Sequence, residues 1–345
     1  MPPIAVTMGE PSGIAPQLSV VAWHQLSRAY HRRETSQDVP SFFVIGDVAC
    51  LERAVRMRFS HPDAVPIQPI SHPREAHAVF PERLPVIPLP LQEEVRWGVP
   101  CLSHQEQVLS SIDTACRFVQ QGHASAIVTN PIHKASLYAA GCSFPGHTEM
   151  MARYGGGTPV MMLCDIEASW RVALITGHCP FADVIAQLSP QRIMSKTAIV
   201  HDALIRDFAI ARPRLALAAL NPHAGESGRM GTEEQTILQP AIDMLRQRSI
   251  HVEGPVPADT LFLSHTHTPY DAIICLYHDQ GLIPFKLLCF ERGVNVTLGI
   301  PFIRTSPAHG VAFDIVDSGT ARVESIIAAL SLAWGLAQRR MAETA

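Results

Sequence analysis

Residues 271–314 read DAIICLYHDQGLIPFKLLCFERGVNVTLGIPFIRTSPAHGVAFD, and this stretch decides the fold class. It begins with an apolar run at 272–276, bounded by polar residues, which predicts a strand buried on both faces of a parallel sheet. His278 and Asp279 follow at once. In open α/β sheets, ligands bind beyond the carboxyl ends of the strands, so this histidine and aspartate are well placed for chemistry.

Three polar side chains then recur in segments otherwise dominated by Leu, Ile, Val, Phe and Gly: Lys286, Asn295 and Arg304. Charged groups are seldom buried without a partner, so this pattern indicates an anionic ligand. The planar guanidinium of Arg304 has the fork geometry that suits either a phosphate or a carboxylate.

The same alternation of strand, polar turn and helix extends over the rest of the chain and predicts an α/β fold. A length of 345 residues favours two domains over one. The glycine-containing turn at 8–13 either presents backbone N–H groups to an anion or simply joins a strand to a helix, and the second interpretation is preferred. The strand candidates are 4–7, 42–45, 86–89, 126–129, 171–176 and 215–220.

Composition excludes several classes of protein. The formal charge of -4 and the pI near 6.5 leave no basic stripe for a nucleic-acid backbone. No run of about eighteen apolar residues and no export signal is found, so we expect a cytoplasmic protein without membrane contact. The eight cysteines form no C-x-x-C pair, which fits buried small hydrophobes better than a zinc knuckle or disulfide framework.

Three histidines each come one to three residues after an apolar strand run: His178, His223 and His278. Neighbouring parallel strands would bring their carboxyl ends together, and three converging imidazoles suit a divalent transition metal such as zinc. Spacings of 45 and 55 residues match no local zinc signature, and any single histidine is more often a hydrogen-bonded loop residue. The threefold repetition favours the metal site.

Other polar residues allow two interpretations each. His147 and Thr148 follow a Pro-Gly turn and either begin a helix, with Thr148 or a neighbour as the N-cap, or contact a ligand. Asp259 is either a helix cap or a carboxylate facing the metal. The glycine-rich run at 225–234 resembles a mobile loop over a site, and the segment 254–260 is expected to precede the final strand.

Taken together, seven blocks resemble the 4-hydroxythreonine-4-phosphate dehydrogenases of pyridoxal phosphate biosynthesis. They are TMGEPSGIAP, TNPIHKA, PGHTE, LNPHAGESGRMGTEE, GPVPADTLF, YHDQGLIPFK and GVNVTLGIPFIRTSPAHG, and they extend from Thr7 to Gly310. The resemblance implies an isocitrate/isopropylmalate-dehydrogenase-like fold, with two α/β/α domains flanking a cleft. We expect a first, cofactor-side domain at 1–135 plus 300–345. We expect a second domain at 136–299, with the metal histidines and the dimer interface.

The family's site residues fall on matching positions of this chain. The resemblance implies a homodimer whose metal ligands, His178, His223 and His278, come from both subunits, and substrate contacts from His147, Thr148, Lys286, Asn295 and Arg304. Lys286 is the candidate catalytic residue, and Asp259 and Asp279 would support the metal ligands. The metal would be zinc, cobalt or magnesium.

The segment SPAHGVAFDIVDSG is similar to the cofactor loop of related decarboxylating dehydrogenases, which implies NAD or NADP contacts at His309 and Gly310. It departs from the commoner pattern at Ala308, where an Asp is usual, and at 316–318. NAD would bind as a dissociable cosubstrate.

The implied reaction is the NAD-dependent oxidation of 4-phosphooxy-L-threonine to a β-keto acid, which loses carbon dioxide to give 3-amino-2-oxopropyl phosphate. Three alternatives remain open: a dehydrogenase for another four-carbon phosphorylated acid, such as 4-phosphothreonate or 4-phosphoerythronate, a phosphate acyltransferase, and a non-catalytic binding protein. The first of these ranks above the other two.

Overall fold

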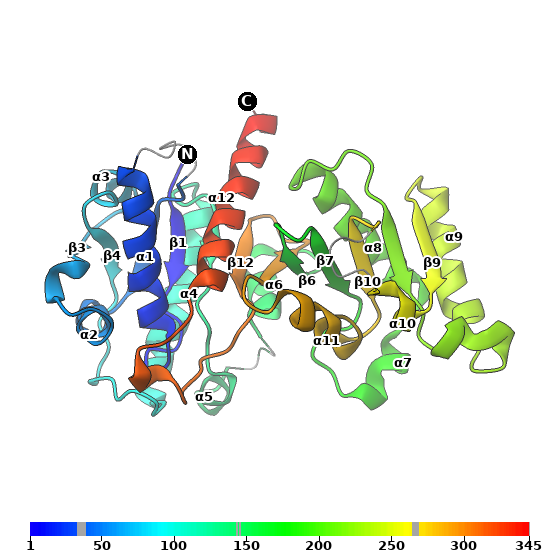
Figure 1. The fold of residues 1–345 in the computed structure, drawn as a ribbon, viewed down its shortest axis with the longest axis horizontal. Helices are drawn as coiled ribbons and strands as arrows, with labels where there is room; N and C mark the ends of the chain where they lie inside the picture. The colour runs from blue at the N-terminus through cyan, green and yellow to red at the C-terminus, as the bar shows by residue number, and fades with distance from the viewer. Residues whose placement is uncertain (33–38, 143, 145, 264–268, 345) are drawn as a thin grey trace. The chain divides into compact units, whose positions relative to one another are not determined.

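The computed structural model describes residues 1–32, 39–142, 144, 146–263 and 269–344. The chain divides into two compact units, which are described separately (Figure 1). The first unit comprises mainly Met1–Gly156 and Pro301–Met341, and the second comprises mainly Gly157–Ile300. The chain first passes between the units after Gly156, later than the 135/136 division expected from the sequence.

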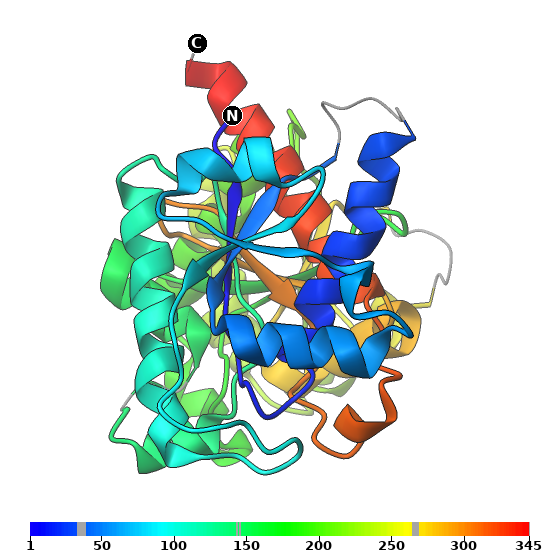
Figure 2. The same ribbon diagram turned by 90° about the vertical axis from the view of Figure 1, so that its left-hand side faces the viewer.

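The first unit is built on a parallel sheet with the strand order β3-β4-β2-β1-β5-β12. Helix α4 lies on one face, and α1 and α12 lie on the other (Figure 2). Its strands are β1 (Ile4–Thr7), β2 (Phe42–Gly46), β3 (Ile67–Pro69), β4 (Leu84–Pro88), β5 (Ile127–Val128) and β12 (Arg304–Pro307). Its α-helices are α1 (Ala15–His31), α2 (Val48–Arg58), α3 (Ala76–Val79), α4 (Gln105–Gln120), α5 (Lys134–Ala139), α6 (His147–Gly155) and α12 (Glu324–Thr344). Its short 3-10 helices are η1 (Pro62–Ala64), η2 (Pro73–Glu75), η3 (Leu102–His104) and η7 (Val316–Ser318).

The second unit has a mixed sheet with the strand order β11-β6-β7-β10-β8-β9. Strands β7, β10, β8 and β9 are parallel, whereas β6 is antiparallel to both β7 and β11. Its strands are β6 (Val160–Asp165), β7 (Trp170–Leu174), β8 (Leu215–Ala218), β9 (Val252–Val256), β10 (Ala272–Cys275) and β11 (Val294–Leu298). Its α-helices are α7 (Val184–Gln187), α8 (Pro190–Arg206), α9 (Gln239–Gln247), α10 (Ala258–Leu261) and α11 (His278–Cys289). The remaining turns are the 3-10 helices η4 (Phe181–Asp183) and η5 (Pro222–Gly228), and the π-helix η6 (Glu234–Leu238).

The strand predicted at 272–276 is confirmed as β10, which lies between two parallel neighbours and is completely buried. A short strand with sheet partners on both edges and helices on its faces has no solvent-exposed side, which explains its continuous apolar sequence. The expectation that it is the final strand is wrong, because β11 and β12 follow. Residues 252–256 also form a strand, β9, in place of part of the expected connection.

Side-chain caps fix where two of the helices begin. Asp47 caps α2 by accepting a hydrogen bond from Cys50 N at 2.6 Å, and Ser189 caps α8 by accepting one from Arg192 N at 3.2 Å. Helix α6 is different, because its N-cap is Gly146 and no side chain caps it. Thr148 is therefore not the N-cap, which corrects one of its two expected roles and leaves its hydroxyl for other contacts.

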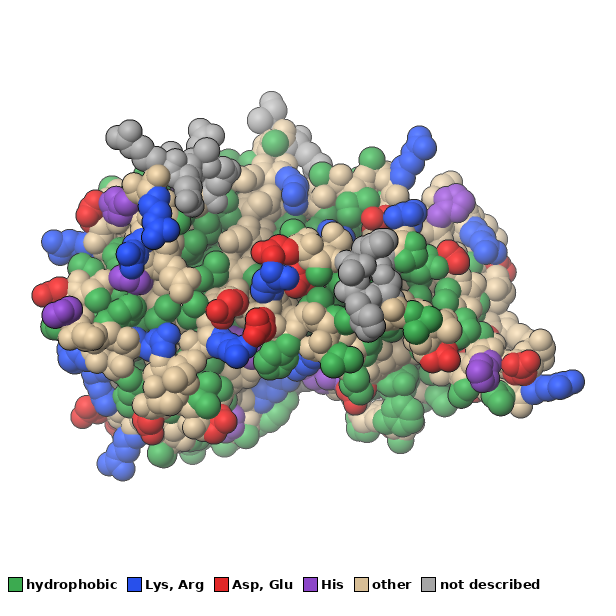
Figure 3. Space-filling model, in the orientation of Figure 1, with side chains coloured by type: hydrophobic (Ala, Val, Ile, Leu, Met, Phe, Trp, Pro, Cys, Tyr) green, Lys and Arg blue, Asp and Glu red, His purple; other side chains and the backbone are tan. Residues whose placement is uncertain are grey.

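The surface agrees with the composition. On the face shown in Figure 3, Lys and Arg side chains are interspersed with Asp and Glu side chains. Among the helices that the structure describes, none is both long and apolar enough to cross a membrane. All eight cysteines are free, and five of them are buried, which confirms that most serve as small hydrophobic residues: Cys50, Cys116, Cys164, Cys275 and Cys289.

Candidate active site

Two of the three candidate metal histidines lie side by side in the second unit. His178 follows β7 and His278 begins α11 directly after β10, and their ring centroids are 5.3 Å apart. Both line a pocket of about 390 Å³ next to the carboxyl ends of these parallel strands. The other lining residues are Gly177, Cys179, Pro180, Phe181, Val184, Tyr277 and Asp279.

Contacts beyond the strands hold this pair of histidines in place. Thr176 Oγ1 donates a hydrogen bond to Leu276 O at 2.7 Å, which joins the two segments just after β7 and β10. Gly281 allows α11 to pack closely on β7, since a Cβ atom at this position would lie 2.6 Å from Val172 Cγ1. The helix that carries His278 is therefore seated on the strand that leads to His178.

A buried amide, Gln280, connects the ends of β8 and β10. Leu276 N donates to Gln280 Oε1 at 2.7 Å, and Gln280 Nε2 donates to Ala219 O at 2.7 Å. Because both partners lie just beyond their strands, this side chain fixes the separation of the segments that lead to His223 and His278. Gln280 lies in the block YHDQGLIPFK, two residues after His278, but the sequence does not show that it joins two strand ends.

Asp279 orients His278. The Nδ1 atom of His278 lies 2.6 Å from Asp279 Oδ1, and because a carboxylate oxygen can only accept, Nδ1–H donates to it. That tautomer presents Nε2 as the nitrogen that can bind a metal. Asp259 lies elsewhere, in the first turn of α10, which contacts the turn η5 that carries His223.

His223 lies apart from the other two histidines and does not line their pocket. Its side chain is exposed, and it begins a run of five residues, 223–227, with positive φ values from 42° to 77°. Four of the five are not glycine, and each such residue costs about 1–2 kcal/mol in this conformation. Strain of this kind persists only where surrounding contacts impose it, and it concentrates at functional sites.

A single chain brings together only some of the ligands that a metal ion needs. Among the described ranges of the chain, no three His, Cys, Asp or Glu side chains come close enough to hold a metal ion. His178 and His278 nevertheless share a pocket, and one ring has the supporting carboxylate that metal-bound histidines usually have. Two imidazoles provide half of a tetrahedral site, so a further protein ligand from outside this cluster is required.

In the first unit, Arg304 is a buried cation on β12. Its side chain is 1% exposed, and both Nε and Nη2 donate to Thr129 Oγ1, the Nε bond measuring 3.1 Å. Burial lowers the pKa of the Arg304 guanidinium to about 9, and the nearby Glu149 carboxylate acts in the opposite direction. Arg304 is therefore charged at neutral pH, in surroundings where an anion gains most from it.

The first turn of α6 lies close to Arg304. Burial, together with the charges of Arg304 and Lys134, lowers the pKa of His147 well below its usual value, so the ring is neutral at pH 7. Within the described part of the chain, no hydrogen-bond partner reaches the buried atoms His147 Nε2 and Glu149 Oε2. Two unpaired polar atoms in one helical turn, beside a buried arginine, indicate a ligand site. Thr148 lies between them on the same turn.

Lys134 extends toward the same turn from α5. A Cβ atom on Gly146 would lie 3.5 Å both from Lys134 Nζ and from Glu149 Oε2. A cation and a carboxylate thus both lie close to the backbone at Gly146. The sequence identified His147 and Thr148 here but not Glu149, whose signal is its place in the first turn of an uncapped helix.

The last two candidate substrate residues lie in the second unit. Lys286 is exposed on α11, the helix that begins with His278. Asn295 lies on β11, and its Oδ1 atom is buried with no hydrogen-bond partner among the residues described. The candidate substrate residues are thus divided, with His147, Thr148 and Arg304 in one unit and this pair in the other.

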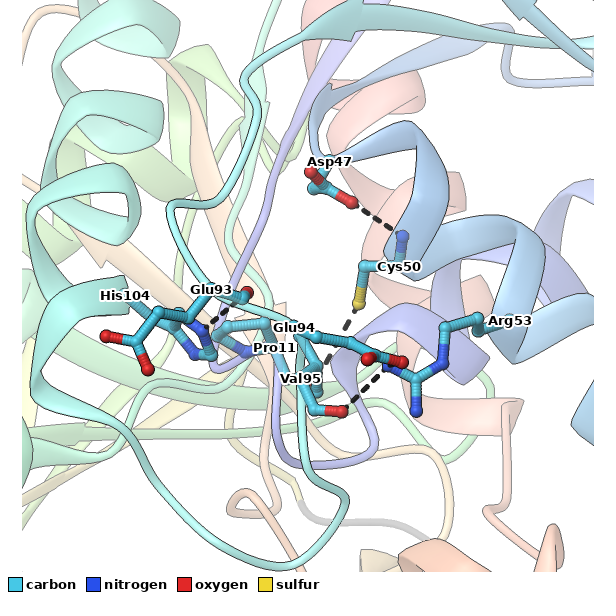
Figure 4. A network of polar contacts seen from close by, with 8 residues as sticks. All are labelled: Pro11, Asp47, Cys50, Arg53, Glu93, Glu94, Val95 and His104. Atoms are coloured by element: carbon cyan, nitrogen blue, oxygen red, sulfur yellow. Dashed lines mark hydrogen bonds and ion pairs between the residues drawn. The ribbon is translucent and has the colours of Figure 1, made fainter.

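The turn after β1 is held by the protein's own groups. Glu10 is buried and accepts a hydrogen bond from Ser12 N at 3.1 Å through Oε1. Cys50 Sγ donates to Pro11 O at 3.9 Å, and the cap of α2 by Asp47 adjoins this contact (Figure 4). The Glu10 carboxylate already accepts a hydrogen bond from a backbone N–H group of the turn. This favours the interpretation of the turn as a strand-to-helix connection over its interpretation as an anion site.

The expected cofactor loop follows β12. His309 Nδ1 lies 3.1 Å from Gly310 O, and Ala308 N donates to Ser325 Oγ at 3.1 Å. The unusual residues 316–318 form the turn η7, so this departure from the family pattern is a local helical turn.

Comparison with known proteins identifies the family. Residues 38–333 match the model described as pyridoxal phosphate biosynthetic protein PdxA. The chain belongs to the PdxA family. It is 42% identical over 345 residues to the 4-hydroxythreonine-4-phosphate dehydrogenase of Caulobacter vibrioides, with 98% of each chain covered. It is 40% identical to that of Zymomonas mobilis, with 99% of this chain and 98% of the relative covered.

A solved structure gives the same result for the fold of this PdxA-family chain. The 4-hydroxythreonine-4-phosphate dehydrogenase of Klebsiella pneumoniae matches with a TM-score of 0.82 and 35% identity, covering 98% of this chain and 100% of that one. The resemblance noted from the motifs is confirmed, and so is the α/β fold of the isocitrate-dehydrogenase-like kind. Both units fall within the match. The histidine pair of the second unit and the residues around Arg304 in the first unit therefore both lie in parts of the chain that the solved structure matches.

Proposed function

We propose that this PdxA-family chain oxidises 4-phosphooxy-L-threonine with NAD to 2-amino-3-oxo-4-phosphooxybutanoate. This β-keto acid then loses carbon dioxide to give 3-amino-2-oxopropyl phosphate, in pyridoxine 5'-phosphate biosynthesis. The observation that carries the proposal is the cluster around Arg304, which pairs a buried cation with unpaired polar atoms on the first turn of α6. Likeness to dehydrogenases over nearly the whole chain supports it.

The Arg304 cluster binds the anionic groups of the substrate. Arg304 supplies a fixed fork of N–H donors, and Lys134 adds a second charge near the N-terminus of α6. Helix N-termini attract anions, and none of the described side chains caps the backbone N–H groups of this one. His147 and Thr148 contribute neutral hydrogen-bonding groups that orient the substrate.

Glu149 favours an amino acid over the alternative hydroxy acids. Its buried Oε2 atom has no donor among the described residues, and an ammonium group on the substrate would provide one. In 4-phosphothreonate and 4-phosphoerythronate a hydroxyl takes the place of the ammonium. A hydroxyl can only donate a hydrogen bond to this carboxylate, whereas an ammonium also brings an opposite charge, so the site favours 4-phosphooxy-L-threonine.

His178 and His278 would hold the divalent cation, together with His223 of the partner subunit in a homodimer. When bound, zinc, cobalt or magnesium supplies the Lewis acidity that activates an alcohol and polarises a carbonyl. Asp279 keeps the His278 ring in the tautomer that this role needs, and Asp259 supports the turn that carries His223.

The loop after β12 would contact NAD or NADP through His309 and Gly310, which makes the first unit the cofactor side. Lys286 is the proposed proton-transfer residue, because it is exposed on the helix that also positions His278. Asn295 supplies an unpaired amide oxygen to the substrate.

The test is NADH formation by purified enzyme with added zinc or cobalt, compared between 4-phosphooxy-L-threonine and the two hydroxy acids. We expect turnover of the amino acid, loss of activity after chelation, and recovery when metal is restored. Glu149→Gln should narrow the preference for the amino acid, while keeping the activity with 4-phosphoerythronate within about threefold. Turnover of a hydroxy acid alone would contradict the proposed substrate.

A further inference from the structure

We propose that Glu234 is a positioning residue, whose carboxylate imposes the left-handed turn that carries His223. The inference rests on the metal-ligand role proposed for His223. It concerns a residue that touches neither substrate nor metal in that proposal and that acts only through the backbone of the turn.

The turn needs an external cause for its conformation. Residues 223–227 all have positive φ, and the series contains His223 (φ 51°), Ala224 (φ 52°), Glu226 (φ 42°) and Ser227 (φ 58°). Apart from His223, none of these is Gly, Asn, Asp or His, the residues that adopt this region most readily. The local sequence therefore opposes the observed backbone, and contacts from outside the run must hold it.

Glu234 provides those contacts from the start of the π-helix η6. Its side chain is 6% exposed. Oε1 accepts hydrogen bonds from Leu220 N at 2.9 Å and Asn221 N at 2.7 Å, and Oε2 accepts one from Asn221 Nδ2 at 2.9 Å. Three donors thus converge on one carboxylate, directly before the residues that enter the left-handed run.

The fit between this carboxylate and the turn is close. A Cβ atom on Gly225 would lie 2.7 Å from Glu234 Oε2, so the turn can pack against the carboxylate only if this position is glycine. Gly225 also has a φ of 77°, which favours glycine for a second reason. Glu234 therefore contacts the middle of the turn as well as its entry.

Glu234 is the first residue of a π-helical turn. Single π turns are rare and are frequently found at functional sites. Glu233, the residue before it, shares only one contact of the network, from Asn221 Nδ2 at 2.8 Å. Glu233 thus offers a matched control with the same charge, neighbouring position and a shared partner.

The variant Glu234→Gln tests the proposal. Its amide has one oxygen and one NH₂ group, so it cannot accept from all three donors, and a donor would face a donor. The full-length enzyme is loaded with cobalt, and metal affinity is measured by competition with a chelator, together with the visible spectrum of the bound cobalt. We expect a 10- to 100-fold loss of cobalt affinity and an altered spectrum, with the KM for NAD unchanged within twofold.

Control variants distinguish a specific effect of Glu234 on cobalt affinity from general destabilisation. Glu233→Gln should keep cobalt affinity within threefold, because its amide oxygen can still accept from Asn221 Nδ2. Wild-type affinity and spectrum in Glu234→Gln would overturn the proposal. So would a loss of cobalt that came with equal losses in Tm and NAD binding, since that marks general destabilisation.

If Glu234→Gln does not fold, Glu234→Asp keeps the charge but draws it back by one methylene, and the same readouts apply to it. His223→Ala tests the underlying function separately. If that variant keeps its cobalt affinity, the ligand role proposed for His223 fails, whatever Glu234 does to the turn.

Discussion

His278 Nδ1 lies 2.6 Å from Oδ1 of Asp279, the next residue in α11. The same kind of pair occurs on α8, where His201 Nδ1 lies 3.1 Å from Asp202 Oδ1. Among the residues that the structure describes, only the first pair has a second imidazole beside it, because the ring of His178 lies 5.3 Å from that of His278. The pair on α8 can therefore serve as a control for the effect of Asp279 on His278.

Asp279→Asn should weaken the binding of zinc or cobalt by about 10- to 100-fold, because the amide no longer accepts the Nδ1 proton as a carboxylate does. Competition with a chelator measures the affinity, and Asp202→Asn should leave it unchanged. Equal affinities in the two variants would mean that Asp279 does not support a metal ligand.

Because His178 and His278 lie close together within one chain, we can predict which dimers of two different variants regain activity. If His223 comes from the partner subunit, mixing inactive His223→Ala and His278→Ala chains should create one intact site per heterodimer and restore up to about half of the activity per heterodimer. Mixing His178→Ala with His278→Ala chains should restore none, because every site would lack one of the two. NADH formation after confirmed subunit exchange measures both. Recovery in the second mixture would contradict a shared pocket for this pair.

Arg304→Lys tests the need for a fork of donors. A lysine keeps the charge but cannot make paired, coplanar hydrogen bonds, so we expect kcat/KM for the phosphorylated substrate to fall by about 30-fold, or roughly 2 kcal/mol. Arg246→Lys is a suitable control, because Arg246 forms an exposed pair with Asp243 at 3.3 Å. An unchanged kcat/KM in Arg304→Lys would exclude a bidentate contact with the substrate.

The parts of the fold that follow from local pattern were predictable. Strand β10 is a continuous apolar run because it is buried on both faces, and His278 and Asp279 stand out because polar residues interrupt apolar surroundings there. The antiparallel pairing of β6 with β7 and β11 was not predicted, because pairing depends on contacts between segments far apart in the sequence. Such contacts leave no periodic signal within any one segment.

The supporting residues of the candidate site escaped prediction for a related reason. Glu234 accepts from backbone N–H groups 13 and 14 residues away, and Gln280 joins a nearby backbone N–H group to a carbonyl 61 residues away, so their roles appear only once these segments are close. The Oε2 atom of Glu149 has no hydrogen-bond partner among the described residues to reveal its role, and it is noticed because it is buried. Family resemblance predicts the candidate ligands, and the structure adds the groups that hold their segments in place.

The neutral state of His147 predicts how stability depends on pH. Burial, with smaller effects from Arg304 and Lys134, places its folded-state pKa well below the value of about 6.5 expected in an unfolded chain. The unfolded state therefore binds the proton first as pH falls, so His147 disfavours the folded state below about pH 6.5, by at most about 1.4 kcal/mol per pH unit. Above that pH it has no such effect.

His147→Gln removes the titrating ring, so the fall in Tm between about pH 7.5 and about pH 5.5 should be smaller in this variant than in the wild type. Thermal unfolding at both pH values measures the difference, and His61→Gln, at an exposed position, controls for the loss of any imidazole. The same pH dependence in wild type and His147→Gln would show that folding leaves the pKa of His147 unchanged. The ring would then be partly protonated near pH 6.5, and it could not serve as the neutral group that orients the substrate beside Arg304.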